Sequence, residues 1–293
     1  MADNTQKGPG KVWTPGLKDN EFRRLSEFIY KQVGILMPPS KKTMLSARLQ
    51  KRLSILKQSS FTEYVDWVLD PKHAGEELIH FIDIVTTNKT DFFREPAHFE
   101  YMSKTALPAL VERFGAGVSR PLKIWSAACS SGEEPYTLAI VLHEFGETLP
   151  ARKINANVLA TDISSRVLQR AKKAVYESTK TDPIAINLKK KYLLRSKDRS
   201  KKLVRMGPEL RNMIKFRRLN FMDNDYGIGD KMDIVFCRNA IIYFDRPTTE
   251  AIVNKFCRHM TPGGYLFIGH SETLNDLKTP LEPVAPTIYQ LPG

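Results

Sequence analysis

Three acidic residues near the middle of the chain have the spacing of a nucleotide-binding site. Glu133 and Glu134 directly follow the run SAACSSG, whose small residues allow a tight turn, and Asp162 ends the apolar stretch VLATD. In a strand–turn–helix–strand unit, an acidic residue at the end of the second strand binds the ribose hydroxyls of a nucleotide. The pattern therefore predicts half of a nucleotide site, with Asp162 on the ribose.

The turn indicates which class of nucleotide derivative would bind. A dinucleotide fold uses the motif G-x-G-x-x-G, whose backbone amides cradle a pyrophosphate, whereas this turn holds one glycine, Gly132. Glu133 and Glu134 would also repel a pyrophosphate. S-adenosylmethionine has no phosphate and carries an ammonium and a sulfonium group, so it avoids this repulsion. Two alternatives stay open: the glutamates complement the dipole of the following helix, and Asp162 caps the next helix.

The hydrophobic pattern predicts the elements that position these residues. Residues 122–125 form a short apolar strand, and the turn at 126–132 leads into a helix that Ser130 or Ser131 can cap. Residues 158–160 form the second strand. Because further strands alternate with helices after it, we predict an α/β fold with a doubly wound, mostly parallel sheet.

Composition excludes several classes of protein. The chain of 293 residues is 42% hydrophobic and 26% charged, as soluble globular proteins are. No run approaches the ~18 apolar residues of a membrane span, and the N-terminus lacks the apolar core of a signal peptide, so we expect a cytoplasmic protein without membrane insertion. The cysteines, Cys129, Cys237 and Cys257, are odd in number and lack C-x-x-C spacing, which predicts reduced thiols and no metal site.

The net charge of +13 is unevenly distributed. Residues 166–218 contain eighteen Lys or Arg against four Asp or Glu, which indicates a solvated face or a surface for nucleic acid or an acidic protein. A predicted helix at 40–57 is also basic and contains no acidic residue. On it, Arg48, Lys51 and Arg52 fall on one stripe. This stripe either docks an acidic partner or is a solvated helix face.

The chain divides into two predicted domains. Residues 1–17, rich in Gly and Pro, form a disordered tail, and residues 18–87 form a small all-α domain. Residues 88–95 break the helical period and form a linker that contributes to the site. Residues 96–293 form the α/β domain, with a basic insertion at about 174–212 that holds a small β-subdomain.

Five motifs, in chain order, resemble those of the chemotaxis receptor methyltransferases, the CheR family: NKTDFFRE, IWSAACSSGEEPY, ATDIS, FCRNAIIYFD and GGYLFIGHSE. The resemblance extends from Phe22 over nearly the whole chain. It implies a fold of the S-adenosylmethionine-dependent methyltransferase type. It also implies an enzyme that methylates glutamate side chains on the cytoplasmic helices of chemoreceptors, with no metal, and releases S-adenosylhomocysteine. The basic stripe Arg48, Lys51 and Arg52 would then dock the receptor substrate.

The resemblance also implies the cofactor contacts, which are Asn88, Thr90, Arg94, Glu134, Asp162, Asn220, Phe221, Arg238 and Asn239. Two side chains are candidates for catalysis by their own chemistry and position. Arg94 can grip a carboxylate, of cofactor or substrate, with two hydrogen bonds, and Tyr243, four residues after Asn239, can project toward the sulfonium or the substrate. In the alternatives, Arg94 pairs locally with Asp91 or Glu95, and Tyr243 packs under the sheet edge.

Two further expectations concern segments outside these contacts. Some family members bind a receptor-tail peptide through a glycine-bearing β-subdomain, but the matching segment at 195–206 has no glycine, which argues against that tether. We expect a monomer. The run His270-Ser271-Glu272 is assigned a structural role because sequence neighbours on a strand point in opposite directions.

Three other functions are weighed against this one. A nucleic-acid methyltransferase would suit the basic segment 166–218, but amino-directed base methylases carry an Asp/Asn-Pro-Pro-aromatic loop where this chain has Arg238-Asn239-Ala240-Ile241. An oxidoreductase is disfavoured by the missing glycines. A non-catalytic signalling module that keeps the cofactor fold is the remaining alternative.

Overall fold

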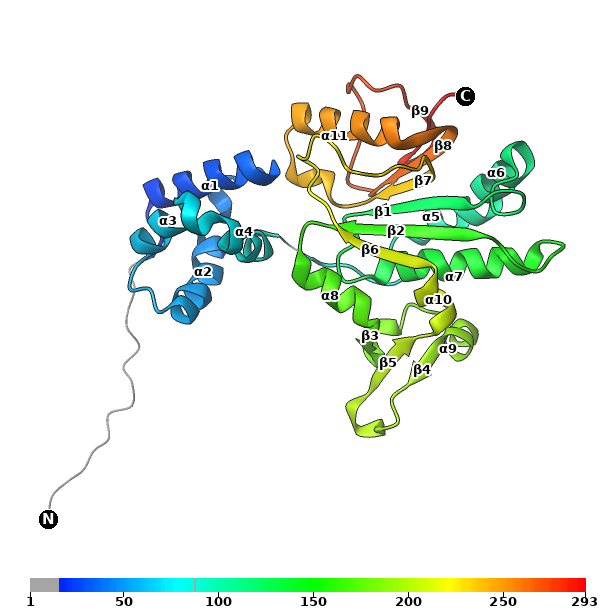
Figure 1. The fold of residues 1–293 in the computed structure, drawn as a ribbon, viewed down its shortest axis with the longest axis horizontal. Helices are drawn as coiled ribbons and strands as arrows, with labels where there is room; N and C mark the ends of the chain where they lie inside the picture. The colour runs from blue at the N-terminus through cyan, green and yellow to red at the C-terminus, as the bar shows by residue number, and fades with distance from the viewer. Residues whose placement is uncertain (1–15, 87) are drawn as a thin grey trace, which may run out of the picture. The chain divides into compact units, whose positions relative to one another are not determined.

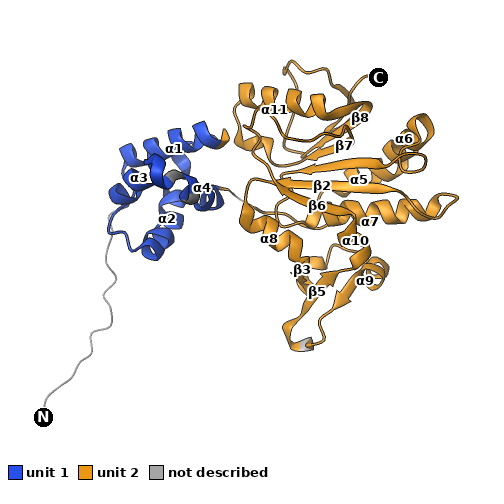
Figure 2. Ribbon diagram, viewed as in Figure 1, with its two compact units in different colours: residues 1–32, 36–85 blue, residues 33–35, 86–293 orange. Residues whose placement is uncertain are grey.

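The computed structural model describes residues 16–86 and 88–293, and the chain divides into two compact units (Figure 2). The helical unit comprises residues 1–32 and 36–85, and the α/β unit comprises residues 33–35 and 86–293. Of the predicted disordered tail, residues 1–15 lie outside the described residues. Leu17, at the end of that tail, is buried, so the packed chain begins earlier than predicted. No described helix is long and apolar enough to cross a membrane.

The helical unit is built from α1 (Asp19–Val33), α2 (Lys42–Leu56), α3 (Phe61–Leu69) and α4 (Pro71–Val85). The Ser60 side chain caps α3, because its hydroxyl accepts a hydrogen bond from the backbone N–H of Glu63 at 3.2 Å. The helix predicted at 40–57 begins two residues later, at Lys42, because a 3₁₀ turn at Pro39–Lys41 precedes it. α4 starts at Pro71, a residue type suited to the first helical position.

A seven-stranded sheet forms the centre of the α/β unit (Figure 1), in the order β6-β2-β1-β7-β8-β10-β9. The parallel strands are β6 (Ile214–Arg218), β2 (Ala156–Asp162), β1 (Leu122–Ala127), β7 (Met232–Cys237) and β8 (Met260–Ile268). β10 (Ile288–Gln290) pairs antiparallel with β8, as predicted, and with β9 (Glu282–Ala285), which the sequence did not indicate. The strand order reverses between β1 and β7, and such sheets bind ligands at this point.

The two faces of the sheet bury separate apolar clusters. Ile124 and Phe236 face α5 (Pro96–Tyr101), α6 (Leu107–Phe114) and α7 (Glu133–Thr148), with one π-helical turn, Met102–Ala106, between α5 and α6. Trp125 and Val235 face the opposite way, toward α11 (Arg246–His259). α8 (Ser165–Lys173) packs beside β2 and β6 on the α7 side (Figure 1). The predicted three-layer α/β architecture is confirmed.

The basic insertion forms a small antiparallel sheet in the order β3-β5-β4. Its strands are β3 (Val175–Glu177), β4 (Leu193–Arg195) and β5 (Leu203–Met206), accompanied by α9 (Ile186–Tyr192) and α10 (Pro208–Asn212). The basic segment 166–218 extends beyond this insertion: its last residues form β6 (Ile214–Arg218), an edge strand of the main sheet. Charged residues suit an edge strand because they oppose pairing with another chain.

Candidate functional site

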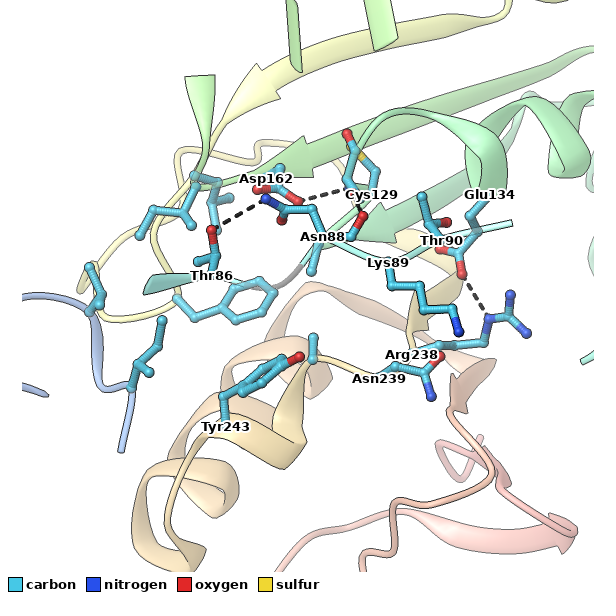
Figure 3. A pocket seen from close by; sticks show the side chains of 18 of the residues that line it. Thr86, Asn88, Lys89, Thr90, Cys129, Glu134, Asp162, Arg238, Asn239 and Tyr243 are labelled. Carbon is cyan, nitrogen blue, oxygen red and sulfur yellow. Dashed lines mark hydrogen bonds and ion pairs between the residues drawn. The ribbon is translucent and has the colours of Figure 1, made fainter. Parts of the chain in front are cut away.

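A pocket lies at the carboxyl ends of β1, β2 and β7, next to the reversal of strand order (Figure 3). Its walls come from the turn after β1, the loops after β2, β6 and β7, and the segment 86–94, all within the α/β unit. It brings together every residue that was predicted to bind the cofactor or to act in catalysis. These are Asn88, Thr90, Arg94, Glu134, Asp162, Asn220, Phe221, Arg238, Asn239 and Tyr243.

The turn after β1 needs backbone conformations that side chains disfavour. Gly132 has φ 100°, and a Cβ there would lie 2.8 Å from the Tyr176 hydroxyl and 2.9 Å from the Ala171 Cβ. Glycine is therefore required. Gly132 is also the N-cap of α7, with no side-chain cap, so the predicted cap by Ser130 or Ser131 is wrong. Ser130 is held at φ 50°, outside the extended conformation of a capping serine.

The Asp162 carboxylate holds this turn against the second strand. It is buried, and its Oδ2 accepts a hydrogen bond from the backbone N–H of Ser130 at 2.8 Å. Its Oδ1 accepts one from the backbone N–H of Ser164 at 2.9 Å, while the Ser164 side chain caps α8. The alternative that Asp162 caps α8 is therefore wrong. Asp162 also lines the pocket, where its carboxylate oxygens can accept hydrogen bonds from hydroxyl groups of a ligand.

The two glutamates after the turn have different surroundings. Glu134 lines the pocket and is buried, with its Oε1 accepting from the Ser126 hydroxyl and its Oε2 from Arg238 Nε, each at 2.7 Å. Glu133 is not among the pocket-lining residues, and its carboxylate accepts from the Ser131 hydroxyl at 2.8 Å. Burial raises the pKa of Glu133. The helix-dipole interpretation thus suits Glu133, whereas Glu134 belongs to the pocket.

Arg238 lines the pocket and connects three segments of the chain. Besides its bond to Glu134, its Nη1 donates to the backbone carbonyl of Arg94 at 2.7 Å and to His98 Nδ1 at 3.1 Å. Its guanidinium also lies over the Phe99 ring, 5.0 Å from the centroid, and its side chain is 2% exposed. The end of β7, the first turn of α7 and the segment 86–94 are therefore fixed to one another by a single buried cation.

The Arg94 side chain reaches the pocket with donors to spare. Its Nη1 donates to the backbone carbonyl of Lys89 at 3.1 Å, and its Nε lies 3.9 Å from a Glu95 carboxylate oxygen. Asp91 pairs instead with Lys180, at 3.2 Å. A guanidinium has five N–H donors in a planar fork, so the long contact with Glu95 leaves enough donors for a ligand carboxylate.

The loop after β7 carries Asn239 and Tyr243 to the pocket (Figure 3). Asn239 has φ 57°, a conformation that asparagine tolerates better than most residues, and its Nδ2 donates to Glu95 Oε1 at 3.3 Å. Tyr243 ends the 3₁₀ turn Ile241–Tyr243, is half-buried and lines the pocket. A position at the pocket wall counts against the alternative that Tyr243 only packs under the sheet edge.

Part of the pocket lining is apolar. Ile163, Leu219 and Phe221 line the pocket together with Asp162, which suits a purine ring beside a ribose. Asn220 shapes this wall, because its Oδ1 accepts from the backbone N–H of Met222 at 3.0 Å. Asn88 lies in the linker and also lines the pocket, and its backbone carbonyl accepts a hydrogen bond from the Ser130 hydroxyl at 3.4 Å.

One group of potential metal ligands lies behind Arg238. Ligand atoms of Glu95, His98 and His270 lie within 4.8 Å of one another. However, Arg238 Nη1 donates to His98 Nδ1 and lies 3.4 Å from Glu95 Oε2, so a cation there would meet a guanidinium. His98 Nε2 is also engaged, 2.8 Å from the Thr287 hydroxyl. These residues do not fit a metal.

The buried side chain of His98 should make the free energy of unfolding depend on pH. Burial, together with the Arg238 guanidinium, lowers the pKa of His98 to about 4. Between that value and about 6.5, the pKa of an exposed histidine, the unfolded chain binds a proton that the folded chain does not. The free energy of unfolding should therefore fall as the pH drops through this window, by about 2 kcal/mol. Urea titrations of the parent and His98→Asn should show a shallower pH dependence for the variant, and equal slopes would contradict this assignment.

The predicted docking stripe on α2 is divided by its contacts within the helical unit. Arg52 forms a bidentate ion pair with buried Glu77, Nε to Oε1 at 2.9 Å and Nη2 to Oε2 at 2.5 Å. Arg48 Nη1 donates to the backbone carbonyl of Ile84 at 2.7 Å. Lys51 is exposed. The charge of Arg52 is thus used to neutralise a buried glutamate, which argues against a docking role for that residue.

Sequence reasoning missed several residues that build the site. Ser126 and His98 anchor Glu134 and Arg238, and Glu95 binds Asn239. No local pattern marks them, because each partner is distant in sequence or hidden within an apolar element. Glu95 was considered only as a partner of Arg94.

The pocket residues fit S-adenosylmethionine. Asp162 offers acceptors for ribose hydroxyls, and apolar side chains line the pocket beside it. Arg94 supplies a cation for the amino-acid carboxylate, and Glu134 supplies a carboxylate near the same end of the pocket. No cradle of amides for a pyrophosphate is needed for this ligand.

Comparisons with known proteins agree with this geometry. The family description "CheR methyltransferase, SAM binding domain" matches residues 88–289, and "CheR methyltransferase, all-alpha domain" matches residues 20–86. The chain is 37% identical to "Chemotaxis protein methyltransferase" of Borreliella burgdorferi, covering 92% of this chain and 94% of the relative. It is 36% identical to "Chemotaxis protein methyltransferase 2" of Pseudomonas aeruginosa (92% and 92%). It is 35% identical to "Chemotaxis protein methyltransferase" of Escherichia coli (94% and 92%).

Proposed function

Because the chain belongs to the CheR methyltransferase family, we propose that it methylates glutamate side chains of chemoreceptor cytoplasmic helices. S-adenosylmethionine is its cofactor. The observation that supports this proposal most directly is that Asp162, Glu134, Arg94 and Tyr243 line the same pocket. The pocket lies where the strand order of the sheet reverses, and it offers acceptors for a nucleoside together with a cationic side chain.

The proposed reaction needs little acid–base catalysis by the protein. When bound, the cofactor would supply a methyl group on its sulfonium sulfur: a glutamate oxygen would bond to the methyl carbon as the carbon–sulfur bond breaks, which gives a methyl ester and S-adenosylhomocysteine as the leaving group. Glutamate, with a pKa of about 4.3, is already ionised at neutral pH, so no general base is required. The residues must instead align the carboxylate and exclude water. Arg94 would grip a carboxylate, and Tyr243 would border the acceptor.

We predict that Arg94 matters to turnover more than to folding. Its side chain is 35% exposed, and among the described residues its guanidinium donates one hydrogen bond, to the backbone carbonyl of Lys89. Arg94→Ala should keep its melting temperature within a few degrees and lose most methyl transfer. Arg94→Lys should restore little, because an ammonium cannot reproduce a two-pronged grip. Full activity of the Lys variant, measured by radiolabelled methyl transfer, would contradict the bidentate role.

The proposed substrate is tested by offering the protein competing acceptors. Radiolabelled methyl transfer should be followed to receptor cytoplasmic fragments, to the same fragments with Glu→Gln changes at candidate positions, and to duplex and single-stranded nucleic acid. We expect base-labile label on the unchanged fragments alone. Label on nucleic acid would favour a nucleic-acid methyltransferase, and no label with normal cofactor binding would favour a non-catalytic module.

The exposed part of the α2 stripe is proposed to dock the receptor. Receptor helices that bear methylatable glutamates are acidic, so Lys51 would attract them over a Debye length of about 8 Å at physiological salt. Such electrostatic contacts mainly increase the rate at which the two proteins associate. Lys51→Glu should slow receptor methylation severalfold at low salt and leave cofactor affinity unchanged. Lys72→Glu, an exposed reversal on α4, is the matched control. Equal rates for both variants would leave α2 as a solvated face.

The remaining partners follow from this substrate. We infer a cytoplasmic site of action, since the proposed acceptor helices are cytoplasmic, and a monomer that works on them one at a time. A receptor-tail tether at the β-subdomain is not part of the proposal, because residues 195–206 lack the expected glycine.

A further inference from the structure

A buried carboxylate lies next to the pocket without lining it. Glu272 follows β8 and is 6% exposed. Its Oε2 accepts hydrogen bonds from the backbone N–H groups of Asn239 at 2.8 Å and Gly269 at 2.6 Å. Its Oε1 accepts from those of Ile241 at 2.9 Å and Ile242 at 3.3 Å. One carboxylate therefore serves four backbone donors, three of them in the loop after β7.

That loop has an uncommon backbone shape. Asn239 has positive φ, which few residues other than glycine adopt, although asparagine tolerates it better than most. The loop also lies very close to the chain after β8, because a Cβ on Gly269 would be 2.8 Å from the Asn239 backbone nitrogen. Hydrogen bonds from backbone amides to an ionised carboxylate are stronger than neutral ones. They hold Asn239 and the following 3₁₀ turn in place.

We infer that Glu272 is a positioning residue for methyl transfer: it fixes the loop 239–243 so that Asn239 and Tyr243 face the pocket. This inference rests on the proposed function and assigns a role to a residue that the sequence suggested was merely structural. Glu272 does not line the pocket that holds Asp162 and Tyr243, so it acts through the loop. Sites of this kind need their contact residues held by a supporting layer of hydrogen bonds.

The bonding pattern makes Glu272→Gln a sharp test. Both carboxylate oxygens accept from two N–H groups, so a glutamine of the same size must turn its NH₂ toward two donors, whichever way it lies. Glu272→Asp is smaller but keeps two acceptor oxygens. If Glu272 acts by accepting hydrogen bonds, Glu272→Asp should preserve its function better. If Glu272 acts only by filling space, Glu272→Gln should preserve its function better.

The first readout does not depend on catalysis. Amide hydrogen exchange should show protection of residues 239, 241 and 242 reduced at least tenfold in Glu272→Gln, and less in Glu272→Asp. Glu282→Gln, an exposed carboxylate in the same unit, is the control and should leave this protection unchanged. Parental protection in Glu272→Gln, or greater protection in Gln than in Asp, would overturn the inference.

The second readout separates positioning from a general loss of structure. In Glu272→Gln, kcat for receptor methylation should fall at least tenfold, while the affinity for S-adenosylhomocysteine, measured by calorimetry, should fall by a smaller factor. Only the cofactor contact of Asn239 is loosened, because Asp162, Glu134 and Phe221 lie on other segments and remain in place. An equal loss of both would assign Glu272 to the stability of the whole unit and overturn the inference. If the parent does not methylate receptor, the proposed function fails, and the exchange experiment still tests Glu272.

Discussion

Replacing Arg238 with methionine should lower the free energy of unfolding of the α/β unit by about 3–5 kcal/mol, because it leaves the buried carboxylate of Glu134 without its cation. The same change frees the backbone carbonyl of Arg94, which Arg238 binds at 2.7 Å. Segment 86–94 should then loosen, and cofactor binding should fall with stability. Urea titration and calorimetry measure the two losses.

Two further variants show whether the ion pair causes this loss. Arg246→Met removes an exposed arginine, 65% accessible, from the same unit, and should change the free energy of unfolding by no more than about 0.5 kcal/mol. The double variant Arg238→Met with Glu134→Gln removes the uncompensated charge and should recover part of the stability. A double variant that is less stable by the sum of the two single losses would show that the residues act independently.

The second large effect is expected at Asp162. Asp162→Ala should weaken cofactor binding by about 1.5–3 kcal/mol, which is ten- to a hundredfold, through loss of a charged partner of the ribose hydroxyls. Calorimetry with S-adenosylhomocysteine measures it. Unchanged affinity in a folded protein would exclude the ribose assignment.

The structure requires one refinement of this test. Asp162 also holds the backbone N–H groups of Ser130 and Ser164, so the Ala variant could lose affinity through the turn alone. A thermodynamic cycle separates loss of the ribose contact from distortion of the turn. It compares the parent and Asp162→Ala, each with S-adenosylhomocysteine and with an analogue that lacks the ribose hydroxyls. A direct contact predicts that the parent prefers S-adenosylhomocysteine over the analogue and that Asp162→Ala has lost this preference. A preference retained in full would place the effect in the turn.

Arg238 and Asp162 perform related tasks at neighbouring strand ends. Each buried charge joins loops that belong to different strands: Arg238 joins β7 to α7 and the linker, and Asp162 joins β2 to the turn after β1. Glu272 does the same for the loops after β7 and β8. The pocket is therefore shaped by three buried ionic groups that bind backbone and side-chain partners.

The sequence alone predicted the parts of the site that depend on local order along the chain. Asp162 follows its strand directly, and Glu134 follows the turn whose glycine is required by a φ of 100°. Strand and helix periods are local as well, so the mostly parallel sheet and the helical first domain could be predicted. The family motifs then indicated the linker residues Asn88, Thr90 and Arg94.

Only the tertiary structure decided which charges neutralise one another. Arg238 and Glu134 are 104 positions apart, and Arg52 and Glu77 are 25 apart. In the sequence, Arg52 therefore looked like part of a free basic stripe, and Glu272 looked like an ordinary residue at a strand end. The role of a buried charged residue depends on which group it pairs with when both are removed from water. For partners so distant along the chain, the packing of the sheet and helices determines the pairing, so no local sequence pattern can predict it.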